Sequence, residues 1–208
     1  MTGLREKQKA DRKRRILTAA VAKFRADGYR AVRIEDLASL SQVSVGTVYS
    51  YYRNKEDILI ATVAMEVEEV LASGAAVVSD PPPGVEVPVL ALIFTYYDHS
   101  FNYLSKEMWR NAMALSIEAP ETPNGQRYTE LDRRLSEQVG ALITALQDRG
   151  EVAPCLDAEA LGHLIFNNLN QFFIEFITDE AMTLQDRRDQ VSELMAPLFQ
   201  VLSNNTVA

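Results

Sequence analysis

Hydroxyl side chains gather in one short segment near the beginning of this 208-residue chain. Five of them stand between positions 44 and 51, and a lysine follows: Ser44, Thr47, Tyr49, Ser50, Tyr51 and Lys55. Gly46 lies among them and permits close backbone approach because it has no Cβ atom. Hydroxyls, the amide groups of a helix N-terminus and an ammonium group all suit phosphate oxygens. The segment therefore indicates contact with a nucleic-acid backbone, although a surface helix with aromatic packing produces the same pattern.

Two short helical patterns joined by a sharp corner position these side chains. The first has an apolar face at helical spacing, and the second follows Ser44, which stands where an N-cap is expected. Ser41-Gln42 is too short for anything but a tight turn between them. Two helices joined in this way form a helix-turn-helix, whose second helix enters the major groove of DNA. The apolar positions are Ile34, Leu37, Ala38 and Leu40 in the first helix and Val45, Val48, Tyr49 and Tyr52 in the second.

The whole run resembles the N-terminal DNA-binding domain of TetR-family transcriptional regulators. The resemblance rests on GY at 28–29, DLA at 36–38, VSVGTVYSYY at 43–52 and NKEDI at 54–58. It implies an all-α fold, with a three-helix DNA-binding domain over residues 1–54 and a helical ligand-binding and dimerisation domain over 55–208. The DNA contacts that it implies are Arg33, Ser44, Val45, Gly46, Thr47, Tyr49, Ser50, Tyr51 and Lys55.

Two residues depart from the family pattern. Arg33 stands where the family usually has a threonine or serine that caps the first helix of the motif. Gln42 stands in the turn where glycine is usual, so we expect a non-glycine residue with positive φ at that position. Neither departure removes the helix-turn-helix.

The charge of the chain is divided unequally. The net charge is −8, but residues 1–60 carry 13 Lys and Arg against 7 Asp and Glu, and the remainder carries 8 against 22. Such asymmetry indicates a nucleic-acid face on the first part only. The seven basic residues before position 16 are either a solvated arm or a further phosphate contact. They are Arg5, Lys7, Lys9, Arg12, Lys13, Arg14 and Arg15.

Composition excludes several other classes of protein. No apolar run is long enough to span a membrane, and no signal peptide is recognisable, because the first 15 residues are basic without an apolar segment after them. The single Cys155 excludes an internal disulfide and fits a reducing compartment. We therefore expect a cytoplasmic protein without membrane contact.

The rest of the chain reads as a series of helices. The first is expected to end at Asp27-Gly28, and a long helix runs from Lys55 to about Val78 before three consecutive prolines. Further helices are expected over 86–104, 106–118, 127–149, 157–178 and 183–202. The last two are broadly apolar, and in the resembled family such helices pair with a second copy to form a dimer, although a role in the core of a single chain also fits. The dimer residues we expect are Leu164, Phe172, Val191, Leu194, Met195 and Leu198.

Aromatic and polar side chains in the second part suggest a small-molecule site. A few polar groups within an apolar, aromatic surround are typical of such sites, although each residue alone is more often part of a core or an interface. The set we expect is Tyr96, His99, Tyr103, Trp109, Met113, His163, Phe166, Asn167 and Asn170.

Catalytic and metal-binding patterns are missing from the sequence. The two histidines are far apart, and no zinc, phosphate-loop or nucleophile motif occurs. We therefore expect no catalytic residues, no metal and no cofactor, and a small helical enzyme is the least favoured alternative. The preferred interpretation is a homodimeric repressor that binds a near-palindromic DNA operator and is released by a small hydrophobic or aromatic effector. An activator, or a regulator controlled by a protein partner, has the same fold.

Overall fold

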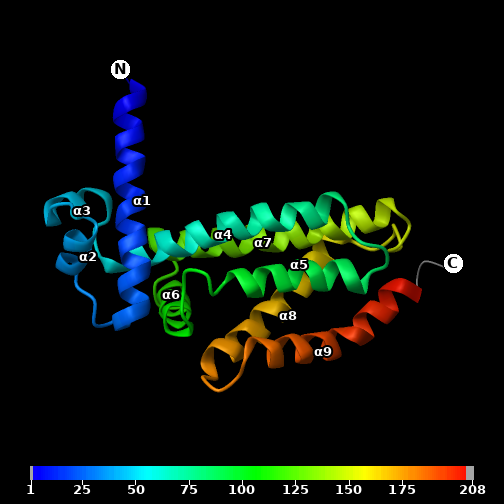
Figure 1. Cartoon of the computed structure of the whole chain (residues 1–208). Helices are drawn as coiled ribbons and strands as arrows, with labels where there is room; N and C mark the ends of the chain where they lie inside the picture. Colours follow the sequence, from blue (N-terminus) through cyan, green and yellow to red (C-terminus); the bar gives the residue numbers. More distant parts are fainter. Residues whose placement is uncertain (1, 205–208) are drawn as a thin grey trace. The chain divides into compact units, whose positions relative to one another are not determined.

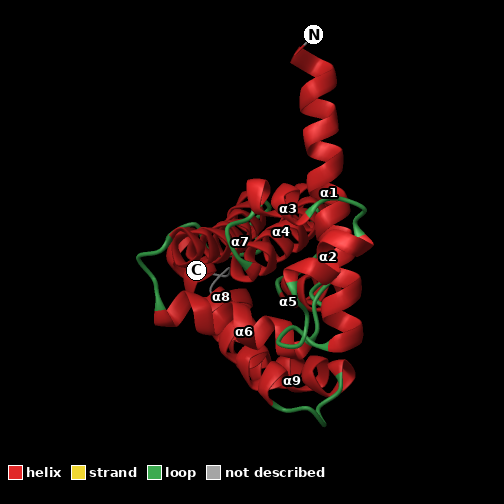
Figure 2. Ribbon diagram, turned by 90° about the vertical axis from the view of Figure 1, so that its left-hand side faces the viewer, coloured by secondary structure: helices red, strands yellow, loops and turns green. Residues whose placement is uncertain are grey.

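A computed structural model describes residues 2–204, without the side chains of Thr2, Leu4, Arg5 and Asn204. The described residues form helices joined by loops, with no strand among them (Figure 2). The helices, labelled in Figure 1, are α1 (Thr2–Asp27), α2 (Ile34–Leu40), α3 (Val45–Tyr51), α4 (Lys55–Ser79), α5 (Glu86–His99), α6 (Lys106–Glu118), α7 (Pro123–Asp148), α8 (Ala158–Thr178) and α9 (Leu184–Asn204). The expected all-α fold is confirmed.

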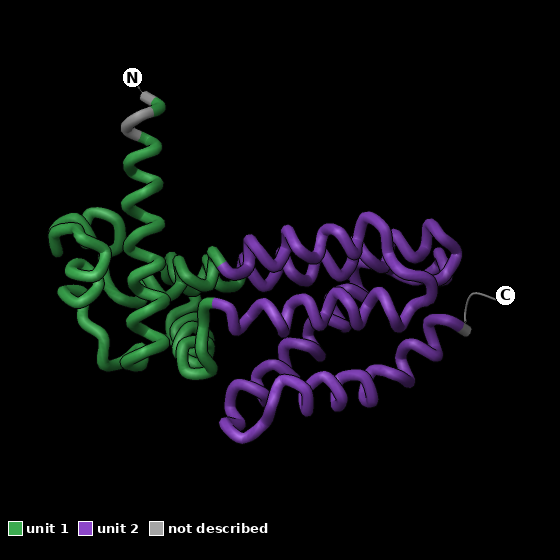
Figure 3. Tube along the Cα trace, in the orientation of Figure 1, with its two compact units in different colours: residues 1–65, 103–129 green, residues 66–102, 130–208 purple. Residues whose placement is uncertain are grey.

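The chain forms two compact units, which Figure 3 distinguishes by colour. The first unit contains the chain up to Met65 and a second segment, Tyr103–Thr129. Helix α6 therefore belongs with α1, α2 and α3. The second unit contains Glu66–Asn102 and the chain from Glu130 onward. The domain boundary expected from the sequence, between residues 54 and 55, separates the DNA-binding motif from the rest of the chain. It remains a proposal about which residues serve each function.

The core of the first unit is built on one face of α1. Ile16, Ala20 and Phe24 are buried there, and Leu37 of α2 and Val48 of α3 are also fully buried. Phe24 meets the ring of Tyr29 edge to face at 5.1 Å, just beyond the end of α1. Gly28 ends the helix with φ +83°, a conformation that favours glycine. The expected end of α1 at Asp27-Gly28 is confirmed.

Two helix boundaries differ from the sequence expectation. The helix expected over 86–104 ends at His99, and Asn102 N–H donates to His99 O at 2.8 Å in the turn that follows. That turn lets the ring of Phe101 pack 5.3 Å from the ring of Phe176. A helix was expected to start at 127, yet α7 begins at Pro123. Proline suits the first helical position because the N–H that it lacks has no partner there.

A preceding threonine caps this early start of α7. The hydroxyl of Thr122 accepts the N–H of Gly125 at 3.2 Å. Gly125 is required at this turn, because a Cβ atom on it would lie 2.5 Å from the carbonyl oxygen of Ala119. Pro123 and Gly125 therefore belong to the first turn of α7.

The second unit contains a close helix crossing and a broad apolar core. A Cβ atom on Gly162 of α8 would lie 2.5 Å from the backbone nitrogen of Gly140 of α7, so the two backbones nearly touch. Helix α9 packs on both α5 and α8. Buried side chains of this core include Leu92, Ile93, Leu142, Ile143, Leu146, Ile165 and Phe199. None of the described helices is long and apolar enough to cross a membrane.

Candidate nucleic-acid interface

The corner between α2 and α3 is held by local hydrogen bonds. The hydroxyl of Ser41 donates back to Leu37 O at 2.6 Å, and Val43 N–H donates to Ala38 O at 3.0 Å. Gln42 between them has φ +56°, which confirms the positive φ expected for this non-glycine residue. The corner thus ends α2 and directs the chain into α3.

Helix α3 begins with a serine cap and presents polar side chains to solvent. Ser44 Oγ accepts the N–H of Thr47 at 3.0 Å and also lies 2.8 Å from Thr47 Oγ1. Val48 is fully buried, whereas Tyr49 is half exposed. Ser44, Gly46 and Ser50 are exposed, and Val45, Thr47 and Tyr51 are half-buried. The structure therefore places the predicted contact residues of α3 at its surface, while Tyr52, expected in the core, is buried.

Arg33 occupies the N-cap position of α2, but a carboxylate of the first turn, not the Arg33 side chain, stabilises the helix start. Its own N–H donates to Asp36 Oδ2 at 2.9 Å, so a carboxylate within the first turn stabilises the helix start. The guanidinium has no acceptor atom and cannot cap the helix amides. It is highly exposed and lies 3.8 Å from Glu35 Oε2. Arg33 therefore keeps a solvent-facing cation at the N-terminus of α2, where phosphate contact was expected.

The structure gives Lys55 contacts within the chain, whereas the sequence predicted a contact with phosphate. Its Nζ donates to the carbonyl oxygens of Tyr29, Arg30 and Val32 at 2.9, 3.1 and 3.1 Å. An ammonium group has three N–H donors, so all of them have acceptors within the chain. We therefore correct the role of Lys55 from an anchor for DNA to a clamp between the start of α4 and the segment that joins α1 to α2.

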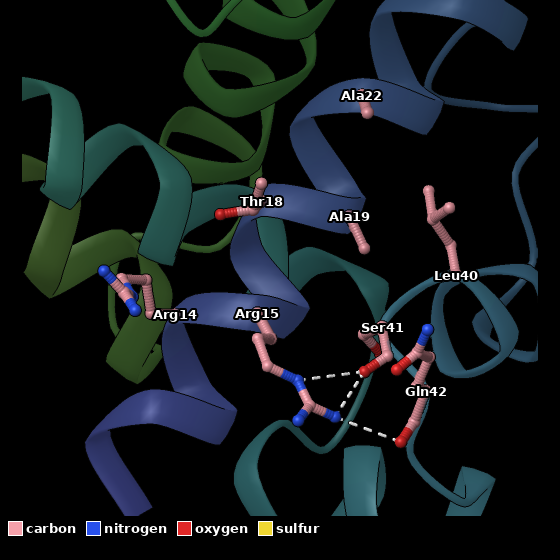
Figure 4. A pocket seen from close by; sticks show the side chains of 8 residues that line it. All are labelled: Arg14, Arg15, Thr18, Ala19, Ala22, Leu40, Ser41 and Gln42. Carbon is pink, nitrogen blue, oxygen red and sulfur yellow. Dashed lines mark hydrogen bonds between the residues drawn. The ribbon is translucent and has the colours of Figure 1, made fainter. Parts of the chain in front are cut away.

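A groove lies between α1 and the α2–α3 corner (Figure 4). Arg15 Nη2 donates to Ser41 O at 2.6 Å and to Gln42 O at 3.0 Å, and Arg15 Nε donates to Ser41 O at 3.2 Å. The lining side chains are Arg14, Arg15, Thr18, Ala19, Ala22, Leu40, Ser41 and Gln42. Arg15 therefore fixes α1 to the corner that immediately precedes α3, a link that the sequence pattern did not reveal.

Comparison with known proteins agrees with this geometry. Residues 16–62, which run from α1 through α3 into α4, match the family described as bacterial regulatory proteins, tetR family. The N-terminal part of the chain therefore carries the DNA-binding domain of that family. The chain is thus a DNA-binding transcriptional regulator. The exposed surface of α3 remains its predicted DNA contact.

Curated relatives match either nearly the whole chain or its N-terminal part. The fatty acid metabolism regulator protein of Bacillus subtilis is 23% identical over 202 residues, which is 94% of each chain. The transcriptional repressor KstR of Rhodococcus jostii is 35% identical over 74 residues, 36% of this chain and 32% of that protein.

Solved structures share the fold over most of the chain. A TetR-family transcriptional regulator from Pectobacterium atrosepticum has a TM-score of 0.69 at 20% identity, covering 92% of this chain and 93% of the other. FadR from Bacillus subtilis, solved in complex with stearoyl-CoA, has a TM-score of 0.65 at 20% identity, covering 87% and 96%.

The residues expected to bind a ligand differ from one another in how far they are buried. Trp109 and Phe166 are buried, and Tyr96, His99, Tyr103, Met113 and Asn170 are half-buried. His163 and Asn167 are exposed on α8, where His163 Nδ1 lies 2.8 Å from Ser136 Oγ. We therefore remove His163 and Asn167 from the expected lining of an internal site, because their stripe faces solvent.

Polar and aromatic contacts in the second unit include residues that the sequence pattern did not single out. The hydroxyl of Tyr96 donates to Gln138 Oε1 at 2.8 Å, and His99 Nδ1 lies 2.5 Å from the buried Glu66. The rings of Phe101, Phe173 and Phe176 pack together at centroid distances of 5.3 to 6.0 Å. These contacts join segments far apart in sequence, so spacing along one helix does not reveal them.

The residues expected at a dimer contact also divide into two groups. Leu164 and Leu194 are each 59% exposed, and Phe172 and Leu198 are half-buried. Val191 and Met195 are buried within the single chain. They pack in the core of the second unit, so we correct their assignment to the dimer surface. Among the described residues, no group of His, Cys, Asp or Glu is arranged to hold a metal ion.

Proposed function

We propose that this protein is a repressor that releases DNA when a molecule with a long apolar acyl chain binds among its C-terminal helices. The observation that carries the proposal is the match over 94% of both chains to a protein named as a fatty acid metabolism regulator. A protein with the same fold was solved in complex with stearoyl-CoA, which suggests the first effector to test.

The chemistry of the second unit supports an apolar effector. The ring cluster Phe101, Phe173 and Phe176 supplies apolar surface that suits a hydrocarbon chain. Tyr96 and His99 add a few polar groups, which already make hydrogen bonds with other side chains of the unit. Apolar surroundings with few polar groups are the usual composition of small-molecule sites.

We further propose that the protein acts on DNA as a homodimer in the cytoplasm. One recognition helix reads only a few base pairs, so two subunits must act together on a near-palindromic site. Leu164 on α8 and Leu194 on α9 are large apolar side chains that the single chain leaves mostly exposed. Such exposed side chains favour a contact through these two helices.

Release follows if the effector prefers a conformation in which the two copies of α3 no longer fit successive major grooves. The effector shifts the equilibrium only by its difference in affinity for the two conformations. A hundredfold loss of operator affinity requires a difference of about 2.7 kcal/mol between them.

The test is a titration of stearoyl-CoA into the complex of the protein with a DNA duplex selected from random sequences. We expect DNA release with stearoyl-CoA, and none with coenzyme A or with a short-chain acyl-CoA. The melting temperature of the DNA-free protein should rise with the same ligand, because only the folded state binds it. If stearoyl-CoA raised the melting temperature but left DNA affinity unchanged or increased it, release as a mechanism would be wrong. If it had neither effect, the acyl effector would be wrong.

A further inference from the structure

An arginine occupies the first buried position of α9. The buried stripe of this helix continues at steps of three and four residues through apolar side chains, which are Val191, Met195, Phe199 and Leu202. Arg187 is 1% exposed, although arginine is seldom fully buried unless its charge is paired. Removing a charge from water is costly unless hydrogen bonds and an opposite charge replace the water. The guanidinium of Arg187 therefore requires partners inside the second unit.

The chain itself supplies only part of this compensation. Arg187 Nη1 donates to Glu175 Oε2 of α8 at 3.2 Å, and the side chain of Glu175 is half exposed. The guanidinium carbon lies 5.7 Å from the centre of the Phe172 ring. Among the described residues, neither Nε nor Nη2 of Arg187 has a hydrogen-bond acceptor, although both atoms are buried. Two nitrogen atoms of a buried cation are thus unsatisfied within the described part of the chain.

The two unsatisfied nitrogens form one edge of the guanidinium. The N–H of Nε and one N–H of Nη2 are parallel, so this edge can donate to both oxygens of one carboxylate at once. Nη1, on the other side of the group, is directed at Glu175. An uncharged carbonyl can also accept from the edge, but it does not balance the charge of the cation. The edge of Nε and Nη2 therefore suits a small anion with two oxygens, such as a carboxylate.

The ring cluster proposed to hold the acyl chain lies close to Arg187. Phe172, which Arg187 contacts, is followed on α8 by Phe173, a member of that cluster. The ring of Tyr97 stacks on Phe173 at 5.9 Å. Burial raises the pKa of the Tyr97 phenol, and the nearby charge of Arg187 opposes that rise. Because α9 packs on both α5 and α8 (Figure 1), a hydrocarbon chain on these rings can place its terminal group beside Arg187.

We propose that Arg187 binds the carboxylate of a long-chain fatty acid whose hydrocarbon chain lies on the ring cluster. The inference rests on the proposed function, because it requires that an acyl chain binds among these helices. A carboxylate is small enough for an enclosed edge, whereas the charged groups of coenzyme A lie far from the acyl carbonyl. A dianion is less suited, because the carboxylate of Glu175 lies beside the same guanidinium. The free acid is therefore a ligand in its own right, and stearoyl-CoA would bind without this ion pair.

Three single variants test this role of Arg187. Arg187→Met removes the charge and keeps an unbranched apolar side chain, whereas Arg187→Lys keeps the charge and loses the two-pronged edge. Arg134→Met is the matched control, because Arg134 belongs to the same unit and pairs with Glu68 through both of its Nη groups. Arg187→Lys also serves the comparison if Arg187→Met does not fold.

Thermal unfolding without ligand separates a binding role from a structural one. Replacing a buried, incompletely paired charge with an apolar side chain is often neutral or stabilising, and Glu175 stays half exposed to water. The Tm of ligand-free Arg187→Met should therefore equal or exceed that of the wild type. An arginine that serves stability alone predicts a lower Tm and an unchanged ligand preference.

The ligands are tetradecanoate and 1-tetradecanol, which share one hydrocarbon chain and differ in the carboxylate. Equilibrium dialysis measures the affinity of each protein for both. We expect the wild type to prefer the acid, and Arg187→Met to lower the affinity for the acid about ten- to a hundredfold while that for the alcohol is unchanged. Arg187→Lys should lose less affinity for the acid than Arg187→Met, and Arg134→Met should behave as the wild type.

The same preference for acid over alcohol in the wild type and in Arg187→Met would overturn the inference, as would a wild type without that preference. DNA release by stearoyl-CoA would in either case still support the proposed function. A wild type that binds neither tetradecanoate nor 1-tetradecanol would overturn both the role of Arg187 and the apolar acyl site.

Discussion

The ammonium group of Lys55 donates to the main-chain carbonyl of Tyr29 at 2.9 Å and lies 4.6 Å from the centre of the same residue's ring. The hydroxyl-bearing ring of Tyr29 is buried, and burial raises the pKa of its phenol above the ordinary value. Lys55 thus joins the first residue of α4 to the segment that connects α1 with α2. Helix α3 lies between Tyr29 and Lys55 in the sequence, so this contact holds the two ends of the helix-turn-helix segment together.

Lys55→Met is expected to lower the free energy of unfolding by about 1.5–3 kcal/mol, because charge-assisted hydrogen bonds to three carbonyls are lost. Urea unfolding measures this, with the exposed Lys7→Met as control. The salt slope of DNA binding should remain that of the wild type. An unchanged stability together with a slope lower by about one per subunit would restore Lys55 as a phosphate contact.

Val45→Arg is expected to change the base preference of the operator. Val45 follows the N-cap of α3 and is half exposed, and its side chain offers only apolar contact, for example to a thymine methyl group. An arginine at this position can donate two hydrogen bonds to guanine. Selection of binding sites from random DNA should therefore recover guanine at one position of each half-site. Identical selected sites for both proteins would show that Val45 faces no base.

Leu164→Glu combined with Leu194→Glu is expected to yield monomers that no longer bind the operator. Both side chains are 59% exposed in the single chain, so the variant should fold, whereas carboxylates in an apolar contact cost several kcal/mol. Light scattering gives the molecular mass. Val87→Glu changes a similarly exposed side chain on α5 and should remain dimeric. A dimeric double variant with intact operator affinity would place the contact on another surface.

Asp132→Asn is expected to alter how stability depends on pH. Burial raises the pKa of the Asp132 carboxyl to about 7, well above its usual value of 3.8. A raised carboxyl pKa adds stability below the unfolded-state pKa, and that contribution is lost as pH rises through the folded-state pKa. The wild type should therefore lose stability relative to Asp132→Asn between about pH 4 and pH 7.

The measurement for Asp132 is urea unfolding of both proteins from pH 5 to pH 8. We expect the variant to gain on the wild type by about 1–3 kcal/mol over this range and the difference to level off above it. A difference that does not change with pH would show that Asp132 is ionised throughout.

The helix-turn-helix and its likeness to the TetR family were predictable from the sequence, because local interactions determine both. Ser44 caps α3 through an amide three residues later, and Gln42 forms the corner within a few residues of its partners. Side chains that face solvent on α3 also follow from the spacing of Val48 and Tyr52, which are buried. Most helix boundaries come from prolines, glycines and caps nearby in the sequence, and they are confirmed for that reason.

Only the tertiary structure decided which neighbour each side chain meets. Lys55 bonds to carbonyls 23 to 26 residues earlier, and Arg15 bonds to carbonyls 26 and 27 residues later. Helical spacing shows which residues share a face but not what covers that face. For this reason, Val191 of α9 was expected at a dimer surface and lies in the core, whereas His163 of α8 was expected in a pocket and faces solvent.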